Sequence, residues 1–274
     1  MLNHEEISRI YQQAYLPEHL PDYVEAISGA TTFLHGNYLC FIRKKHLIFN
    51  GFPLGENTGN AAGAYKTACE TFQPATVAII APEIWLPEET YEKQSADHYY
   101  RLALPLTSLD SQVAYMVRRG QRELNVRLGT FDREHKRLIK DFIKSHDLND
   151  AQIYIYKHIR HYLKHCTSAR ILEARRGDLL VAFTIIDLGA AEYAFYLFNF
   201  RSRKINVPGA SDLLFKEMVK LSQSEHKRAI NLGLGIHSGI RRFKEKWGGT
   251  PFLPYNSAMV HRTPMDLGKL ANKL

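Results

Sequence analysis

The sequence predicts an α+β protein made of two units that share an order of strands and helices. Its 274 residues suffice for one large or two ordinary domains, and 45% hydrophobic with 23% charged residues is typical of a folded protein. Periodicity and turn residues place three strands, a helix and a strand in each half. We therefore expect mixed central sheets flanked by helices, with one domain at residues 1–105 and a second at residues 106–274.

In the first unit, short β-branched and aromatic runs separated by turn residues predict the strands. Three strands are expected, at residues 31–34, 38–43 and 46–50. The stretch Pro53-Leu54-Gly55 then breaks the chain, and the alanine-rich segment after it predicts a helix at residues 58–72. The apolar run at residues 76–81 predicts the next strand.

Between these elements and the end of the chain lies a connecting region. It predicts a strand, a helix and a strand at residues 99–106, 109–119 and 123–128. Two amphipathic helices follow, and they begin near the capping residues Asp132 and Asp150. Their apolar residues recur at helical spacing, so we expect both helices to pack on the sheet of the second unit.

The second unit begins with a predicted hairpin around the turn Arg176-Gly177-Asp178. After it we expect a strand, a helix that begins at Ser211, a short strand, a basic helix and a last strand. The expected bounds of the strands and the basic helix are 170–174, 179–188, 192–200, 228–232, 238–247 and 252–261.

The net charge of +8 and the isoelectric point near 9.3 favour polyanionic partners such as nucleic acid, anionic membranes or phosphorylated cofactors. Solvated helix faces rich in lysine and arginine give the same charge, so charge alone does not select a partner. The separate cysteines Cys40, Cys69 and Cys166 suit a reducing compartment. With a polar first segment and no apolar run of bilayer length, the sequence predicts a cytoplasmic protein without a transmembrane segment.

Several common kinds of site are not indicated. The glycines between Asn231 and Gly239 follow a strand, but their spacing and the lack of a later acidic residue argue against a dinucleotide fold. His158, His161 and His165 share one helix face, yet no fourth ligand accompanies them, so we expect no metal site. Neither G-x-S-x-G nor a Walker sequence occurs, which leaves a hydrolase or NTPase without support.

The stretch Asn231 to Tyr255, NLGLGIHSGIRRFKEKWGGTPFLPY, resembles the end of GNAT-superfamily N-acyltransferases. It is most similar to the branch that contains the Fem peptidoglycan aminoacyl transferases and the FemAB-like acetyltransferases. Phe243, Lys244 and Gly248 match that branch, and residues 115–127 resemble its arginine-rich helix. The resemblance implies tandem GNAT-like domains, of which the C-terminal one is catalytic and the N-terminal one need not be active.

The resemblance also implies a donor site between the fourth strand and the helix after it. Backbone N–H groups of that strand would bind the carbonyl oxygen of the acyl group. The next segment keeps basic and small residues, although the full phosphate-binding pattern of GNAT proteins is missing. Small residues before a helix N-terminus let the backbone approach a phosphate. The residues expected to contact the donor are Tyr196, Phe198, Arg201, Arg203, Gly209, Ala210 and Ser211.

Three residues are the predicted catalytic groups. Lys244 stands where many GNAT proteins have a tyrosine, and it would protonate the leaving group or bind donor phosphate. Asn231, at the end of a strand, is a candidate for positioning a substrate or a water molecule. His237 is the only nearby side chain whose ordinary pKa is close to neutral.

The implied reaction is transfer of an acyl group from acyl-CoA to an amine acceptor. It proceeds through a ternary complex and needs no tightly bound cofactor. Aminoacyl-tRNA is the alternative donor, as in the Fem branch, and a non-catalytic relative that binds a ligand is the third alternative. DNA is not an expected partner, and the sequence does not identify the acceptor.

Overall fold

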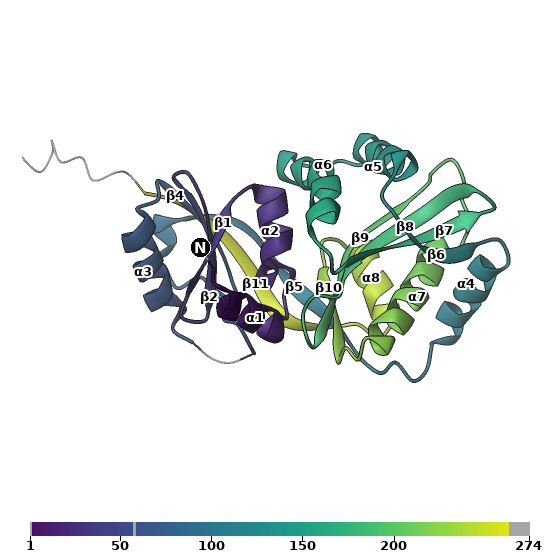
Figure 1. Ribbon diagram of the computed structural model, residues 1–274, viewed down its shortest axis with the longest axis horizontal. Coiled ribbons are helices and arrows are strands. Elements are labelled where there is room, and N and C mark those ends of the chain that lie inside the picture. The colour runs from purple at the N-terminus through teal and green to yellow at the C-terminus, as the bar shows by residue number, and fades with distance from the viewer. Residues whose placement is uncertain (1, 57–58, 263–274) are drawn as a thin grey trace, which may run out of the picture.

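A computed structural model describes residues 2–56 and 59–262 of the chain. In this part of the chain the centre is one mixed sheet of eleven strands, in the order β1-β2-β3-β4-β11-β5-β10-β9-β8-β7-β6. Figure 1 shows two lobes that share the sheet and helices that cover its faces. The predicted α+β class and the helix-flanked mixed sheet are confirmed, although the sheets of the two halves are joined into one.

The N-terminal half follows the predicted order of elements. They are β1 (Thr31–His35), β2 (Tyr38–Arg43), β3 (His46–Asn50), α3 (Ala61–Phe72) and β4 (Thr76–Ala81). The first three strands are antiparallel, and β4 joins β3 in parallel because α3 crosses over between them. Alternate residues of β4 are buried, which aligns them with the apolar face of α3.

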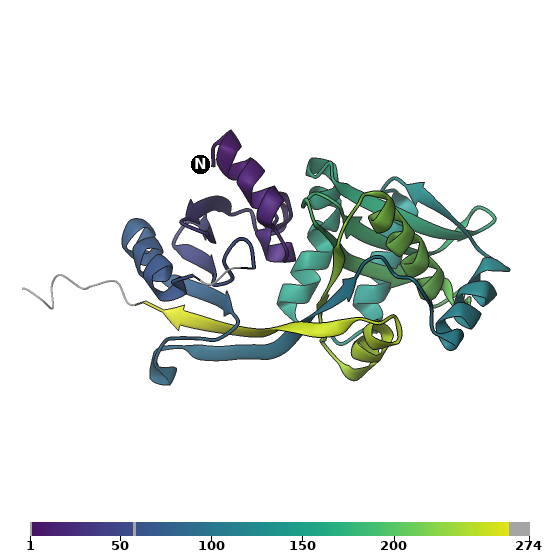
Figure 2. The same cartoon turned by 90° about the horizontal axis from the view of Figure 1, so that it is seen from below.

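Two long strands carry the sheet from one half into the other (Figure 2). They are β5 (Glu92–Ala103) and β11 (Thr250–His261), which pair with each other, and the end of β11 also pairs with β4. The sequence predicted β5 only from Tyr99, because residues 92–98 are polar and mostly exposed and lack an apolar alternation. Both strands belong to both halves, so the domain boundary at residue 105 stays a prediction.

The C-terminal half also follows the predicted order. Its elements are α4 (Ser111–Gln121), β6 (Asn125–Gly129), α5 (Arg133–Ser145), α6 (Asp150–His165), β7 (Ala169–Arg176), β8 (Leu179–Asp187), β9 (Tyr193–Arg201), α7 (Ala210–Ser224), β10 (Ala229–Leu234) and α8 (Ser238–Lys246). One core lies between the sheet and helices α4 and α7, around Phe215 and Met218. A second core lies under α5 and α6, around Tyr162 and Phe183.

Helix starts test the capping predictions. The side chain of Asp132 accepts hydrogen bonds from two backbone N–H groups at the start of α5, as predicted. The prediction that Ser211 begins and caps α7 is wrong. Gly209 occupies the capping position with a φ of 84°, and no side chain caps the helix. A left-handed conformation of this kind favours glycine over serine, which is why the helix begins there.

Three short helices at the N-terminus were not predicted. They are α1 (His4–Gln13), the 3-10 helix η1 (Pro17–His19) and α2 (Pro21–Ser28). Tyr15 and Leu20 from this segment share a core with Tyr193 and Phe195 of β9, so the segment covers the sheet where the two halves meet. No helix in the described part of the chain is long and apolar enough to cross a membrane.

Candidate active site

The parallel strands β9 and β10 pair along three residues and then part. Tyr193, Ala194 and Phe195 lie opposite Ala229, Ile230 and Asn231, and no pairing between the strands continues beyond them. The rest of β9 stays hydrogen-bonded to β8, while the rest of β10 stays bonded to β5. The sheet is therefore opened along one line inside the C-terminal half, at the place where the sequence predicted a donor site.

A β-bulge lies in β9 just beyond its last residue paired with β10. Phe198 lies opposite Ile185 and Tyr196 lies opposite Ile186, so Leu197 is an extra residue in β9. A bulge leaves the extra residue out of the regular ladder. It also sends Tyr196 and Phe198 to opposite faces, where Tyr196 packs on Phe215 and Phe198 joins the core under α5 and α6. Both side chains therefore pack in the cores, and the predicted contact of this stretch with a donor through its backbone stays a prediction.

Lys244 of α8 directs its ammonium group to the end of β10. The residue is 3% exposed, and its Nζ donates a hydrogen bond of 2.6 Å to the carbonyl oxygen of Leu234. The same Nζ lies 5.5 Å from the centre of the Tyr100 ring. Burial lowers the pKa of Lys244 to about 7, an effect that the nearby Asp97 carboxylate only partly offsets. Lys244 can therefore gain or lose a proton near neutral pH.

The loop from β10 to α8 holds a strained residue beside this lysine. Ile236 has a φ of 58°, a left-handed conformation that is an outlier for a β-branched residue, and its side chain is 61% exposed. A hydrogen bond of 2.6 Å from its backbone N–H to Asp97 Oδ2 fixes this conformation. Strain of this kind concentrates at functional sites. Neither residue was predicted as part of a site, because Asp97 lies in the polar start of β5 and Ile236 is of a residue type that disfavours a left-handed conformation.

Asn231 is placed inside the core between the two halves. It is fully buried, its Nδ2 donates to the carbonyl oxygen of Tyr15 at 2.8 Å, and its Oδ1 accepts from the Gly233 N–H at 2.7 Å. Both ends of the amide are therefore engaged by the protein. The side chain thus connects the N-terminal segment to the place where the pairing of β5 and β10 changes register. Its predicted role in positioning substrate stays a prediction.

His237 caps α8. Its Nδ1 accepts hydrogen bonds from the backbone N–H groups of Gly239 and Ile240, at 3.2 and 3.4 Å. An accepting Nδ1 carries no proton, so this role requires the neutral ring. The side chain is exposed, and its predicted role in proton transfer stays a prediction.

The segment between β9 and α7 contains the predicted phosphate-binding residues. A Cβ atom at Gly209 would lie 2.1 Å from the carbonyl oxygen of Met116, so this glycine permits α4 to approach the N-terminus of α7. No side chain caps α7, which leaves N–H groups of its first turn free of side-chain partners. Asp212 in that turn bonds to Trp247 and Lys246, so one carboxylate already lies near the positive end of the helix.

The basic residues of this segment are separated from its small ones. Arg201, Arg203 and Lys204 are exposed at the end of β9, and Arg203 donates a hydrogen bond of 3.2 Å to the carbonyl oxygen of Ser145. Ala210 is buried, while Ser211 is partly exposed. The exposed cations are free to meet phosphate groups, and their predicted contact with a donor stays a prediction.

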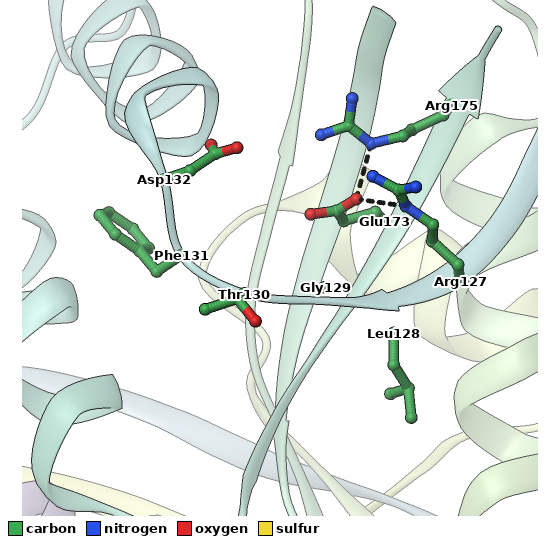
Figure 3. A pocket seen from close by; sticks show the side chains of 8 residues that line it. All are labelled: Arg127, Leu128, Gly129, Thr130, Phe131, Asp132, Glu173 and Arg175. Atoms are coloured by element: carbon green, nitrogen blue, oxygen red, sulfur yellow. Dashed lines mark hydrogen bonds and ion pairs between the residues drawn. The ribbon is translucent and has the colours of Figure 1, made fainter. Parts of the chain in front are cut away.

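A second group of charges lies far along the sheet, at its last strand, β6. Glu173 accepts hydrogen bonds from Arg175 Nε at 2.6 Å and from Arg127 Nε at 3.0 Å. Burial alone would raise the pKa of Glu173, but these two hydrogen bonds outweigh it and lower the pKa. Glu173, Arg127 and Arg175 line a cavity of about 440 Å³, which Figure 3 shows from close by. Lys244 does not line this cavity.

Histidines, cysteines and carboxylates of residues 2–56 and 59–262 do not gather in groups of three or more that could hold a metal ion. Two of the histidines on α6, His158 and His165, bond instead to backbone carbonyl oxygens one turn earlier.

A strand-helix-strand unit whose parallel strands part beside a bulge is the arrangement expected of a GNAT domain. The fold repeats that unit's order of elements in each half, which is the arrangement of a tandem GNAT fold.

Comparisons with solved structures agree with this class. FemX is 11% identical, with a TM-score of 0.64 over 98% of this chain and 98% of that chain. L-PGS from Bacillus licheniformis is 15% identical, with a TM-score of 0.60 over 98% and 95%. A tandem GNAT protein from the clavulanic acid biosynthesis pathway is 12% identical, with a TM-score of 0.53 over 84% and 79%. No protein-family model and no curated protein matches the sequence. The predicted tandem GNAT fold is thus confirmed.

Proposed function

We propose that the chain is an N-acyltransferase that moves an acyl group from acyl-CoA to an amine. The observation that carries the proposal is the buried Lys244, whose pKa is lowered to about 7, at the end of a strand that parts from its neighbour. A lysine is buried at a cost in solvation, and such a perturbed group in a fold of this class is a candidate catalytic residue.

The chemistry can be assigned to groups of this chain. The acceptor nitrogen attacks the carbonyl carbon of the thioester, and the oxygen of the resulting tetrahedral intermediate gains negative charge. Backbone N–H groups at the Leu197 bulge in β9 are the proposed donors to that oxygen. The bond to sulfur then breaks, and the Lys244 ammonium protonates the departing thiolate. The neutral Lys244 amine then takes the proton that the nitrogen loses, which restores the ammonium. The Leu234 carbonyl oxygen accepts the hydrogen bond from Lys244. The side chains of Leu197 and Leu234 both pack on the core that contains Tyr15, Tyr193 and Phe195.

A second donor, aminoacyl-tRNA, is favoured by the distribution of charge. Residues 1–105 contain 7 Lys and Arg against 12 Asp and Glu, a net charge of −5. Residues 106–274 contain 29 against 16, a net charge of +13. A protein whose positive charge is confined to one half is suited to a polyanion. The same step would then release the ribose hydroxyl in place of a thiol.

Native mass spectrometry of the protein purified from its host tests the donor. We expect a retained CoA or acyl-CoA, one per chain, and a higher melting temperature when acyl-CoA is added. If aminoacyl-tRNA raises the melting temperature and acyl-CoA does not, the second donor replaces the first. Binding of tRNA should also weaken steeply with salt, because several phosphates release counterions, whereas CoA should depend on salt weakly. If neither donor binds, the proposed function is wrong.

A further inference from the structure

A second cavity lies beside the one in Figure 3, on the other side of the loop between β6 and α5. Its volume is about 320 Å³, at the lower end of the range that small-molecule sites occupy. Five apolar side chains line it: Leu128, Phe131, Leu163, Ala169 and Ile171. Leu128 is 58% exposed, although it lies in a strand, so part of this apolar lining is open to solvent.

Three cations line the same cavity. Arg160 and Lys164 lie one turn apart on α6, and Arg170 lies at the start of β7. Within the described ranges no carboxylate lies at ion-pair distance from any of the three. Arg170 bonds only to the backbone carbonyl oxygens of Thr167 and Ala169.

The neighbouring cavity also has cations in its walls, but there carboxylates neutralise their charge. There Arg127 and Arg175 also line the walls, but both bond to the buried Glu173, and Arg175 also pairs with Glu134 at 2.8 Å. Figure 3 shows the two guanidinium groups turned to the Glu173 carboxylate. The two cavities share residues 128–131, so cations of the same kind are paired on one side of the loop and unpaired on the other.

We propose that the cavity beside Arg160, Lys164 and Arg170 binds an organic phosphate whose body is apolar. A phosphate monoester carries nearly two negative charges and suits three converging cations better than a carboxylate does. The apolar lining would take the attached chain or ring, which inorganic phosphate lacks. This site is independent of the acyl transfer proposed at Lys244, because Lys244 and the residues of β9 and β10 are not among its lining residues.

Isothermal titration with hexyl phosphate, inorganic phosphate and hexanol tests the proposal on the full chain. We expect hexyl phosphate to bind at least about tenfold more tightly than either comparison compound, because charge and apolar contact act together. The variant Arg160→Gln/Lys164→Gln/Arg170→Gln should weaken hexyl phosphate at least about tenfold. The variant Leu128→Ser should bind hexyl phosphate more weakly, because part of the apolar lining is lost. Its affinity for inorganic phosphate should not change.

The matched control removes the same charge elsewhere. Three lysines are exposed on α5 and have no carboxylate partner among the described residues: Lys136, Lys140 and Lys144. The variant in which all three are changed to Gln should bind hexyl phosphate as the unaltered chain does. Equal losses in the two triple variants would mean a general effect of charge and would overturn the proposal, as would a failure of hexyl phosphate to bind. Melting curves check that each variant is folded.

Vesicles distinguish the two sources of such a phosphate. If the ligand is a lipid headgroup, sedimentation with vesicles that contain phosphatidic acid, a phosphate monoester, should exceed that with phosphatidylcholine vesicles and should fall in the Arg160/Lys164/Arg170 variant. If hexyl phosphate binds but vesicles do not, the ligand is a soluble phosphate ester. Both results support the site, whereas a failure of hexyl phosphate to bind refutes it whatever the vesicles do.

Discussion

Two parallel strand pairs occupy corresponding places in the two halves of the molecule, and they differ in how far they pair. In the N-terminal half, β3 and β4 pair along five residues, from His46 opposite Thr76 to Asn50 opposite Ile80. In the C-terminal half, β9 and β10 pair along three residues and then part. The same order of elements thus gives a closed sheet in one half and an opened sheet in the other.

Local features explain the difference. β3 pairs with β2 without a shift in register, whereas β9 has the bulge at Leu197. Beyond β4 the chain brings Trp85 against Phe49 and Tyr65, so aromatic side chains fill that end of the N-terminal half. Beyond β10 it brings the buried Lys244. We infer that the reaction belongs to the C-terminal half and that the N-terminal half supports it.

The helices that connect these strand pairs, α3 and α7, also differ, because only α3 begins with a side-chain cap. The Asn60 side chain caps α3 by accepting a hydrogen bond of 2.8 Å from the Gly63 N–H. Helix α7 begins at Gly209 without a side-chain cap. An uncapped first turn can donate its N–H groups to an anion, whereas a capped one has fewer to offer. This contrast favours the C-terminal half as the location of the proposed donor site.

The largest effect is expected from Lys244→Met, which removes the ammonium group and keeps the length of the side chain. We expect kcat to fall about 10²- to 10⁴-fold, the range for loss of a general acid. Stability should not fall, because a buried charge is replaced by an apolar group. Steady-state kinetics and thermal unfolding measure the two effects.

Lys227→Met is the matched control for that variant. Lys227 also donates to a backbone carbonyl, that of Ala190, at 2.6 Å, and burial also lowers its pKa. It does not contact β9 beyond the paired residues, so we expect kcat to stay within about twofold. If Lys244→Met kept full activity, Lys244 would not take part in catalysis. The parting of β9 from β10 would then not mark a reaction site.

The pH dependence of kcat should follow the Lys244 ammonium. Above its pKa of about 7 the protonated fraction falls roughly tenfold per pH unit, so kcat should decline over the same range. Lys244→Arg keeps a charge but does not release a proton, so its kcat should fall as that of Lys244→Met does if the ammonium is a general acid. A rate profile with no descending limb near pH 7 would mean that Lys244 acts as a fixed cation or not at all.

Stability should reveal the same pKa without an assay of activity. The folded pKa of Lys244 is about 7, below the usual lysine value of 10.5 that holds in the unfolded chain. Between these values the unfolded chain binds a proton that the folded chain does not, so this group makes stability rise with pH by up to about 1.4 kcal/mol per unit. Below pH 7 both states are protonated and the contribution is constant. Lys244→Met should lack this rise in denaturant titrations at pH 7 to 10.

Gly209→Ala should destabilise the chain by about 3 kcal/mol, because the new Cβ meets the Met116 carbonyl oxygen and the φ of 84° is strained. Gly177→Ala is the control. Gly177 has a φ of 57°, but nothing lies within 4 Å of its Cβ position, so we expect about 1 kcal/mol from backbone strain alone. Equal losses in urea titrations would mean that α4 does not approach α7 closely. Gly209 would then be free to serve a ligand.

The sequence predicted the elements whose patterns are local. The strands around Thr31–Asn50 and Thr76–Ala81 matched because their apolar runs end at clear turn residues. The polar start of β5 was missed because its pairing with β11 depends on a partner about 150 residues away, which no local pattern encodes.

The candidate site shows the same limit. Lys244 was predicted from a resemblance, yet its burial and its contact with Leu234 come from the packing of α8 on β10. The left-handed Ile236 could not be predicted, because a β-branched residue argues against that conformation. Asn231 was expected at a strand end but lies inside β10, and one of its two hydrogen bonds goes to Tyr15, which lies in a segment with no predicted structure.

The smallest effect is expected from His237→Ser, which tests whether the helix start in the C-terminal half carries a catalytic group. Serine is a strong N-cap residue and can accept the N–H bonds that His237 Nδ1 now accepts from Gly239 and Ile240. The variant therefore keeps the cap and removes the imidazole ring.

From the capping geometry we expect kcat within about threefold of the unaltered chain and a stability change below about 0.5 kcal/mol. His237→Ala should cost about 1 kcal/mol in stability, because it removes the cap, with an equally small change in kcat. A loss of a hundredfold or more in kcat for both variants, with the stability of His237→Ser unchanged, would instead make His237 a proton carrier. The catalytic difference between the halves would then rest on two side chains, Lys244 and His237, at the ends of one helix.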